Sequence, residues 1–338
     1  MFFSTTNEKE AIIIGKDLKV STENHEFIHG MVTVTVSVGI SLSPMHGKYC
    51  SDLLTASINA TQEVKENGHN GYLLYSDKNN PLTKGHEIYE VKKMITKALE
   101  DDRVVPWYQP IYDIAGKEIH HYEVLARIIN EDGTIIYPNT FIPIAEQHGL
   151  ISSIDRTIFE KGLNYLTELR SLGRELNFSI NISGKNLVND EILDFIKSQL
   201  KNNTCGNNSI IFEITETSAI NNLEKAKTFV KELKELGCQF ALDDFGIGFT
   251  SFIHITELDV DYVKIDGSFV RKIETSINDR QIAQSIANMC KALAIKTIAE
   301  FVENKNILNI LEDSEVDFAQ GYYIGKPAPQ VMNSQFRV

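Results

Sequence analysis

Cysteine is scarce in this chain of 338 residues, which contains only four. The four lie far apart, and no two of them form a CxxC pair: Cys50, Cys205, Cys238 and Cys290. This spacing favours reduced, mostly buried thiols and excludes both a disulfide framework and a cysteine-based zinc site. Such cysteine usage is typical of a cytoplasmic protein, and we expect that location.

The sequence also lacks long apolar runs. No run approaches the roughly 20 residues that a membrane-spanning helix requires. The opening residues, MFFSTTNEKE, have no basic region followed by an apolar core, so they do not resemble a signal peptide. We therefore expect no membrane segment in this chain.

Positive charge is in deficit. Lysine and arginine number 33 against 46 acidic residues, for a net charge of -13. This balance argues against a non-specific hold on long nucleic acid or on an anionic membrane. It does not exclude a small phosphorylated ligand, because bound metal ions invert the local field.

The rest of the composition is that of a globular protein, with 42% hydrophobic and 23% charged residues. The length suits one large domain and a smaller one. The stretch 76–85, SDKNNPLTKG, is polar with Pro and Gly, as in linkers. The predicted organisation is a small α+β segment, a linker with a helix, and a large domain: 1–80, 81–100 and 101–338.

Within the first segment, apolar alternation predicts a strand over 31–42 and a short one over 71–77. A helix is predicted over 51–68, with Ser51 as its N-cap and Gly68 as its C-terminal stop. Helical apolar spacing continues over 86–102.

After Asp102, short apolar strands alternate with amphipathic segments. The predicted strands are 104–113, 121–129, 177–183, 209–217, 239–244, 262–266, 296–302 and 318–324. Predicted helices between them include 155–171, 222–236 and 278–293. Eight strands in this alternation favour an α/β fold, a (β/α)8 TIM-like barrel. An open doubly wound sheet is the alternative, but no GxGxxG or GxxxxGK[ST] loop follows any strand.

Polar residues recur late in the predicted strands. They are Glu123, Asn181, Glu213, Glu216, Asp243, Asp244, Lys264, Asp266, Glu300, Glu303 and Gln320. The C-terminal strand ends of such a barrel converge on one face. Carboxylates gathered there need a cation, and a set of oxygen ligands suits Mg²⁺ or Mn²⁺ rather than zinc. The adjacent Asp243 and Asp244 suit two ions about 3.5–4 Å apart, as in phosphoester hydrolysis.

Simpler interpretations exist for single residues. Asp266 precedes Gly267 and suits the N-cap of a following helix. Lys264 suits a side chain that snorkels from the barrel rim, and Asn181 suits a turn at Gly184. Capping does not explain the apolar-flanked acids, of which Glu123 is one.

The block YEVLAR (122–127) resembles the signature of the EAL-domain family of cyclic di-GMP phosphodiesterases, with Val124 in place of its middle alanine. Eight further blocks match in the family's order: 109–113, 141–149, 181–183, 213–217, 243–251, 263–270, 298–303 and 320–327. The resemblance covers roughly residues 90 to 330.

This resemblance implies a barrel whose first strand is antiparallel to the rest, and hydrolysis of cyclic di-GMP to pGpG with two Mg²⁺ or Mn²⁺ ions. The implied metal ligands are Glu123, Asn181, Glu213, Asp243 and Asp244. Lys264 would orient or help to deprotonate the attacking water. Glu300 would act at the metal centre, and Gln320 would position water or substrate.

The resemblance also implies substrate contacts. Gln109 and Arg127 would hold the substrate, and we expect Leu125, Asp266 and Glu303 at the same site. Glu216 would steady the loop FGIGFTS, which in the family couples the metal site to a dimer interface. A homodimer is therefore expected.

The front segment is similar to the C-terminal half of a GGDEF (diguanylate cyclase) domain, in VTVSVGISLSP and in DLLTASINATQEVKENGHNGYLLY. The GGDEF motif itself does not occur in the chain. The resemblance implies a structural or regulatory segment rather than a cyclase.

Three functions stay open at this point. They are an active phosphodiesterase, a catalytically silent cyclic di-GMP receptor, and a protein-interaction scaffold. The intact acidic ligand set, together with Lys264, favours the phosphodiesterase.

Overall fold

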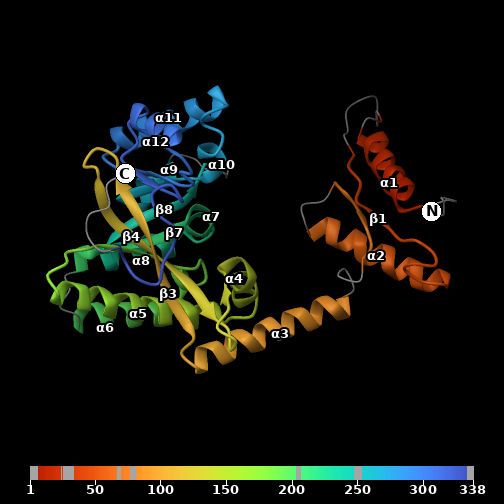
Figure 1. The fold of residues 1–338 in the computed structure, drawn as a ribbon, viewed down its shortest axis with the longest axis horizontal. Helices are drawn as coiled ribbons and strands as arrows, with labels where there is room; N and C mark the ends of the chain where they lie inside the picture. Colours follow the sequence, from red (N-terminus) through yellow and green to blue (C-terminus); the bar gives the residue numbers. More distant parts are fainter. Residues whose placement is uncertain are drawn as a thin grey trace. The chain divides into compact units, whose positions relative to one another are not determined.

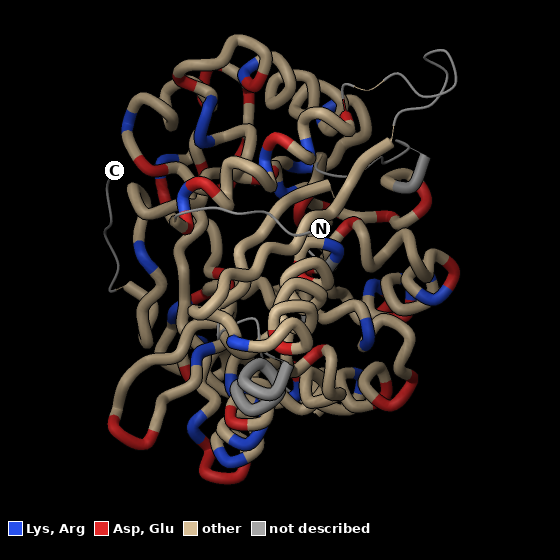
Figure 2. Tube along the Cα trace, turned by 90° about the vertical axis from the view of Figure 1, so that its right-hand side faces the viewer, with Lys and Arg blue, Asp and Glu red and all other residues tan. Residues whose placement is uncertain are grey.

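The computed structural model describes residues 7–23, 25, 34–66, 70–76, 81–202, 207–246 and 253–332. The chain divides into two compact units, Met1–Lys93 and Met94–Val338. Figure 1 draws the fold, and Figure 2 shows acidic and basic residues interspersed along the chain. Among the helices in these ranges, none is both long and apolar enough to cross a membrane.

The first unit contains a small parallel sheet with helices. Its elements are α1 (Glu8–Glu23), β1 (Val38–Ile40), α2 (Cys50–Glu66) and β2 (Tyr72–Leu74), and β1 pairs with β2 in parallel. The predicted strand 31–42 is too long, because residues 34–37 and 41–42 are not in a strand. Ser51 is not the N-cap, because α2 has already begun at Cys50. Gly68, the predicted stop, lies outside the described residues.

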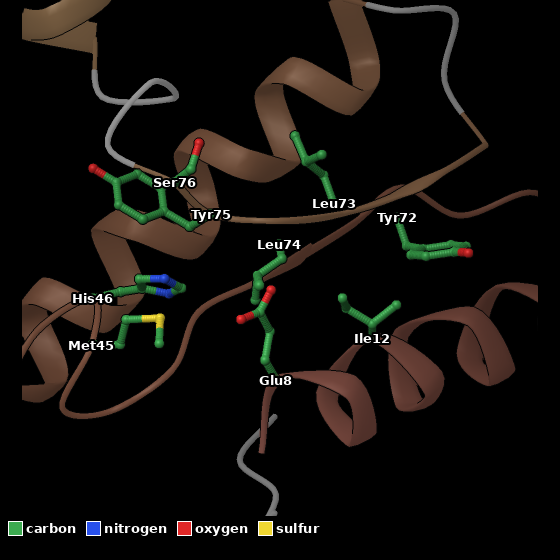
Figure 3. Close-up of a pocket in the computed structure, with 9 residues that line it drawn as sticks. All are labelled: Glu8, Ile12, Met45, His46, Tyr72, Leu73, Leu74, Tyr75 and Ser76. Carbon is green, nitrogen blue, oxygen red and sulfur yellow. The ribbon is translucent and has the colours of Figure 1, made fainter.

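A cavity of about 570 Å³ lies in the first unit between the start of α1 and β2 (Figure 3). Its lining is mostly apolar and includes one acid, Glu8, and one histidine, His46. One carboxylate among these described residues does not provide the acidic cluster that metal chemistry requires.

Helix α3 (Pro81–Glu100) follows and contains the boundary between the two units. The linker predicted over 76–85 therefore extends too far. Pro81 begins the helix, since a proline at the first helical position has a suitable φ and needs no N–H partner.

The second unit is a closed barrel of eight strands. In ring order these are β3 (Val104–Asp113), β11 (Phe318–Gln320), β10 (Lys296–Ala299), β9 (Tyr262–Ile265), β8 (Gln239–Phe245), β7 (Ile210–Thr215), β6 (Phe178–Asn181) and β4 (Glu118–Ile129). Pairing of β3 with β4 closes the ring. β3 is antiparallel to both neighbours, and the other barrel pairs are parallel. The predicted barrel and its antiparallel first strand are confirmed, and the open sheet is wrong.

Helices occupy most of the connections between the strands. They are α4 (Pro138–Gln147), α5 (Ile151–Ser171), α6 (Asp190–Asn202), α7 (Glu216–Asn221), α8 (Leu223–Lys234), α9 (Ile253–Leu258), α10 (Gly267–Val270), α11 (Ile277–Ala292) and α12 (Lys305–Asp313). The described part of this unit also contains the 3-10 turns η2 (Asn186–Val188) and η3 (Asn207–Ser209) and the two-residue strand β5 (Ile135–Ile136). The sequence pattern did not predict β5, which pairs only with the end of β4.

A layer of buried apolar side chains fills the barrel. Its members are Ile111, Ile211, Ala241, Tyr262, Ile298 and Phe318. Each lies two residues from a polar residue of the predicted site: Gln109, Glu213, Asp243, Lys264, Glu300 and Gln320. Because side chains two apart on a strand share a face, the polar residues form the next layer. The apolar layer is thus the floor of the site.

Buried aromatic side chains between the sheet and α5 contribute strongly to the stability of the fold. Phe212 is fully buried, with its ring 5.8 Å from that of Phe159 and 5.6 Å from that of Phe240. We expect Phe212→Ala to lower the unfolding free energy by about 3–5 kcal/mol in urea titrations. The exposed control Leu172→Ala should change it by less than about 0.5 kcal/mol. Equal losses in the two variants would contradict this packing.

Candidate active site

The site is centred on the ammonium group of Lys264, which is 1% exposed on β9. Four carboxylates surround its Nζ: Glu213 Oε2 at 2.7 Å, Glu300 Oε1 at 2.9 Å, Asp243 Oδ1 at 3.3 Å and Glu123 Oε2 at 3.5 Å. The snorkelling interpretation of Lys264 is therefore wrong. Lys264 is the cation between the converging acids, although one ammonium cannot balance four carboxylates.

Burial and the neighbouring charges shift the pKa values in the cluster. Burial opposes the charge on Lys264, but the surrounding acids outweigh it and raise the pKa of this lysine well above its ordinary value. Burial and repulsion from Glu123 raise the pKa of Glu213 well above its usual range. Burial raises the pKa of Glu300 to about 7, although Lys264 opposes the shift. In the absence of other cations, these shifts favour the protonated forms of Glu213 and Glu300.

Glu123 lies in the middle of β4 rather than at its end. Its Oε1 accepts a hydrogen bond from Asn181 Nδ2 at 2.7 Å, and its Oε2 accepts one from Gln320 Nε2 at 2.6 Å. Burial disfavours its charge, but Lys264 and these amides lower the pKa of Glu123 below its ordinary value. Glu123 thus connects strands β4, β6 and β11, and it stays ionised.

A backbone irregularity in β8 brings two consecutive acids to the site. In a regular strand, neighbours point to opposite faces. Here Asp244 has a φ of +58°, and the pairing register with β9 shifts between Leu242 and Phe245. Carboxylate oxygens of Asp243, Asp244 and Glu300 consequently lie within 4.8 Å of one another.

The donor set fits divalent cations. Within the part of the chain that the structure describes, the buried Glu213 Oε1 and Gln320 Oε1 have no hydrogen-bond partner. Oxygen donors of this kind suit Mg²⁺ or Mn²⁺. The cluster has five carboxylates, those of Glu123, Glu213, Asp243, Asp244 and Glu300. When all five are ionised, they and the Lys264 ammonium carry a net charge of four negative units. Two divalent cations neutralise that charge.

Two predicted substrate residues flank this cluster. Arg127 is 5% exposed, and its guanidinium carbon lies 5.6 Å from the Trp107 ring centroid and 5.3 Å from that of Tyr137. Gln109 is half-buried, and its Nε2 donates to the Gly325 carbonyl at 3.3 Å. The sequence analysis missed Trp107 and Tyr137, because nothing in their local pattern distinguishes them from other aromatic residues.

A cavity of about 260 Å³ adjoins the cluster. Its lining includes Leu125 and Asn181, and otherwise largely apolar groups from β4, α4 and α5. Asp155 also faces this cavity and accepts hydrogen bonds from Ser183 N at 3.0 Å and Asn186 Nδ2 at 2.6 Å. The sequence analysis missed Asp155 because it lies on a helix rather than at a strand end. The only local signal is an acid in the largely apolar stretch ISSIDRTIF.

Other predicted residues lie around the cluster rather than in it. Asp266 is the N-cap of α10 and accepts from Ser268 N at 2.7 Å, so the capping interpretation is confirmed. Glu303 is exposed beyond the end of β10. Glu216 is the first residue of α7 rather than part of β7, because the strand ends at Thr215.

Glu216 is 4% exposed, and its Oε2 accepts from Gly246 N at 3.3 Å. This contact lies where the predicted loop FGIGFTS begins. Residues 247–251 of that loop lie outside the described residues, so the predicted dimer contacts there are outside them as well.

The sequence model of the EAL-domain family matches residues 92–327 of this chain. The chain belongs to the EAL-domain family. That match includes all the strands of the barrel and every residue around Lys264.

Curated relatives share this domain. The cyclic di-GMP phosphodiesterase PdeB of Shewanella oneidensis is 35% identical over 297 residues, covering 88% of this chain and 35% of the relative. The cyclic di-GMP phosphodiesterase PdeF of Escherichia coli is 35% identical over 237 residues, covering 70% of this chain and 32% of the relative. The chain thus spans about a third of the length of these two relatives.

Among solved structures, the EAL domain of FimX from Pseudomonas aeruginosa, bound to c-di-GMP, is similar to this chain. It aligns with a TM-score of 0.67 and 27% identity, over 71% of this chain and 97% of that one. The shared architecture is that of the barrel described above.

We expect removal of the Lys264 ammonium to destabilise the folded protein. Lys264→Met leaves four carboxylates around an uncharged side chain, so we expect the unfolding free energy to fall by about 3–5 kcal/mol with EDTA present. The loss should shrink at acid pH, where the carboxylates take up protons. Urea titrations measure it, with the exposed Lys231→Met as the matched control. A Lys264→Met protein as stable as its parent would contradict the central role of this ammonium.

Asp155 predicts a pH dependence of stability. Burial raises the pKa of this carboxyl to about 6 from its ordinary 3.8. The stability from its protonated form is thus fully present below 3.8 and lost as pH rises through about 6. We expect the melting temperature of the parent to fall as the pH rises from about 4 to about 7, because Asp155 loses its proton. This contribution to the fall should be absent in Asp155→Asn. The exposed control Asp194→Asn should retain it, and an unchanged pH profile in Asp155→Asn would contradict the assignment.

Proposed function

We propose that this chain hydrolyses cyclic di-GMP to linear pGpG. The observation that carries the proposal is the buried cluster of carboxylates around Lys264, built on the strands of an EAL-family barrel. The names of two relatives, both cyclic di-GMP phosphodiesterases, support the substrate, as does the c-di-GMP bound to the FimX domain.

Two Mg²⁺ or Mn²⁺ ions are the proposed cofactors. The proposed ligands are Glu123, Asn181, Glu213, Asp243 and Asp244, with Glu300 beside them. When bound, such ions polarise a phosphoryl oxygen and lower the pKa of a bound water. The charge balance and the unpartnered oxygens of the cluster support this assignment.

Lys264 acts in this proposal as a hydrogen-bond donor. Because the acids around it raise its pKa, it remains an ammonium at neutral pH. A protonated lysine orients the attacking water and opposes negative charge at the phosphoryl group. The apolar floor beneath it keeps bulk water away from the lower side of the site.

Arg127 and Gln109 are proposed to hold the substrate. The guanidinium of Arg127 suits a phosphate, and its buried Nε has no partner among the described residues. Leu125 lines the neighbouring cavity, whose apolar walls suit part of a nucleotide base. Asp266 and Glu303 remain predicted substrate residues at the rim.

Four further proposals concern the domains, the assembly and the location of the protein. Residues 1–80 are proposed to derive from the C-terminal half of a GGDEF fold, which the parallel β1–α2–β2 arrangement supports. Residues 101–338 are the proposed catalytic domain.

A homodimer through the loop after Asp244 is also proposed, as is a cytoplasmic location. The three free cysteines among the described residues support the cytoplasmic location.

Nucleotide chromatography after incubation with cyclic di-GMP and Mg²⁺ or Mn²⁺ tests the function. We expect pGpG from the parent and from the control Glu160→Gln, whose side chain is exposed on α5. Glu123→Gln should lower kcat by about 10²–10⁴-fold, since it loses a charged ligand with little change of shape. EDTA should abolish the reaction. Tight binding of uncut nucleotide by the parent would indicate the receptor instead, and absence of binding would leave only a scaffold.

A further inference from the structure

Phe301, which directly follows Glu300, has a backbone conformation that is unusual for its residue type. Its φ is +54°, in the left-handed region. That region is strained for an L-residue with a Cβ, whereas glycine occupies it freely. The chain maintains this conformation beside the carboxylate cluster, although Phe301 itself contributes no polar group to it.

The backbone is anchored on both sides of this turn. Glu300 N donates to the Ile265 carbonyl of β9 at 3.2 Å. Val302 N donates to the Gln320 carbonyl of β11 at 2.9 Å. The left-handed residue therefore lies between two fixed points, and a different φ at this position would displace at least one of them.

The ring of Phe301 is also held in place. It packs against Gly267, where a Cβ would collide with it. The Arg271 guanidinium carbon lies 3.8 Å from the ring centroid, a cation–π contact. The ring nevertheless remains 42% exposed, so burial of apolar area alone does not account for the left-handed turn.

We infer that the left-handed turn at Phe301 is a positioning element that directs the Glu300 carboxylate at Lys264, 2.9 Å away. This inference rests on the proposed phosphodiesterase function for its kinetic consequences. It assigns the effect to the backbone of residue 301 rather than to the ring. The side chain at 301 should then matter chiefly through its tolerance of positive φ.

A substitution series at this position tests the inference. Glycine accepts a positive φ, alanine accepts it with a penalty, and the β-branched valine accepts it least. We expect Phe301→Gly to retain at least the parental kcat. Phe301→Ala should have a lower kcat than Phe301→Gly. Phe301→Val should lose about 10²-fold in kcat with little change in KM, because a misplaced carboxylate impairs chemistry rather than binding.

A second measurement does not depend on turnover. Titration calorimetry with Mn²⁺ alone should give the same order of affinities, glycine first and valine last. Leu172→Val, an exposed substitution at a φ of -86° beyond the C-terminal end of α5, is the matched control and should behave like the parent. Arg271→Ala removes the cation–π contact without altering the tolerance of residue 301, and it should also retain parental kcat.

The outcomes separate the two proposals. If the parent lacks activity but Mn²⁺ affinity still follows the series, the proposed function fails and the positioning role stands. If Phe301→Val keeps parental kcat and Mn²⁺ affinity, the positioning role is overturned. Equal losses in Phe301→Gly and Phe301→Val would assign the effect to the ring and also overturn it. If Phe301→Val does not fold, the order of glycine over alanine decides.

Discussion

The electrostatic balance around one buried ammonium is the constraint on which the rest of this structure depends. Four carboxylates contact Lys264, and Asp244 adds a fifth charge nearby. Such a cluster is costly unless cations or protons compensate it. Lys264 supplies one positive charge against these five, and burial together with repulsion between the acids raises the pKa values of Glu213 and Glu300. The protein therefore keeps a strongly acidic site at the centre of its larger unit.

The barrel makes this cluster possible. Its parallel strands place an apolar layer below and the polar layer above, separated by the two-residue period of each strand. Strands β4, β7 and β8 and the end of β10 thus deliver acids that are far apart in sequence to one ammonium on β9. The antiparallel β3 completes the ring, and Gln109 reaches the same layer from the reverse direction.

Much of this arrangement follows from the sequence pattern. The alternation of strands and helices predicted the barrel, and the acids late in the strands predicted that carboxylates gather at one face of it. The capping of α10 by Asp266 followed from the Asp-Gly pair. In each case the relevant signal is local, because strand period and helix caps are determined by neighbouring residues.

Other features depend on tertiary structure, and the sequence pattern does not contain them. The number of acids around Lys264 depends on how five strands meet. Asp155 lies on α5 and accepts hydrogen bonds from Ser183 and Asn186, which follow β6 in the sequence. The positive φ of Asp244 and of Phe301 arises where adjacent strands fix the backbone, in residues whose types give no warning of it. Strand ends were also predicted too long at β7, β10 and β11. Apolar residues occur beyond the ends of β10 and β11, whereas β7 gives way directly to α7 at Glu216.

The most direct test of the central claim is anomalous diffraction from crystals of this protein soaked in Mn²⁺. The account predicts two anomalous peaks among the carboxylates of Glu123, Glu213 and the Asp243–Asp244 pair, with the Lys264 ammonium still within hydrogen-bond distance of Glu300. Absence of any peak there at millimolar Mn²⁺, with ions bound elsewhere on the protein, would contradict it.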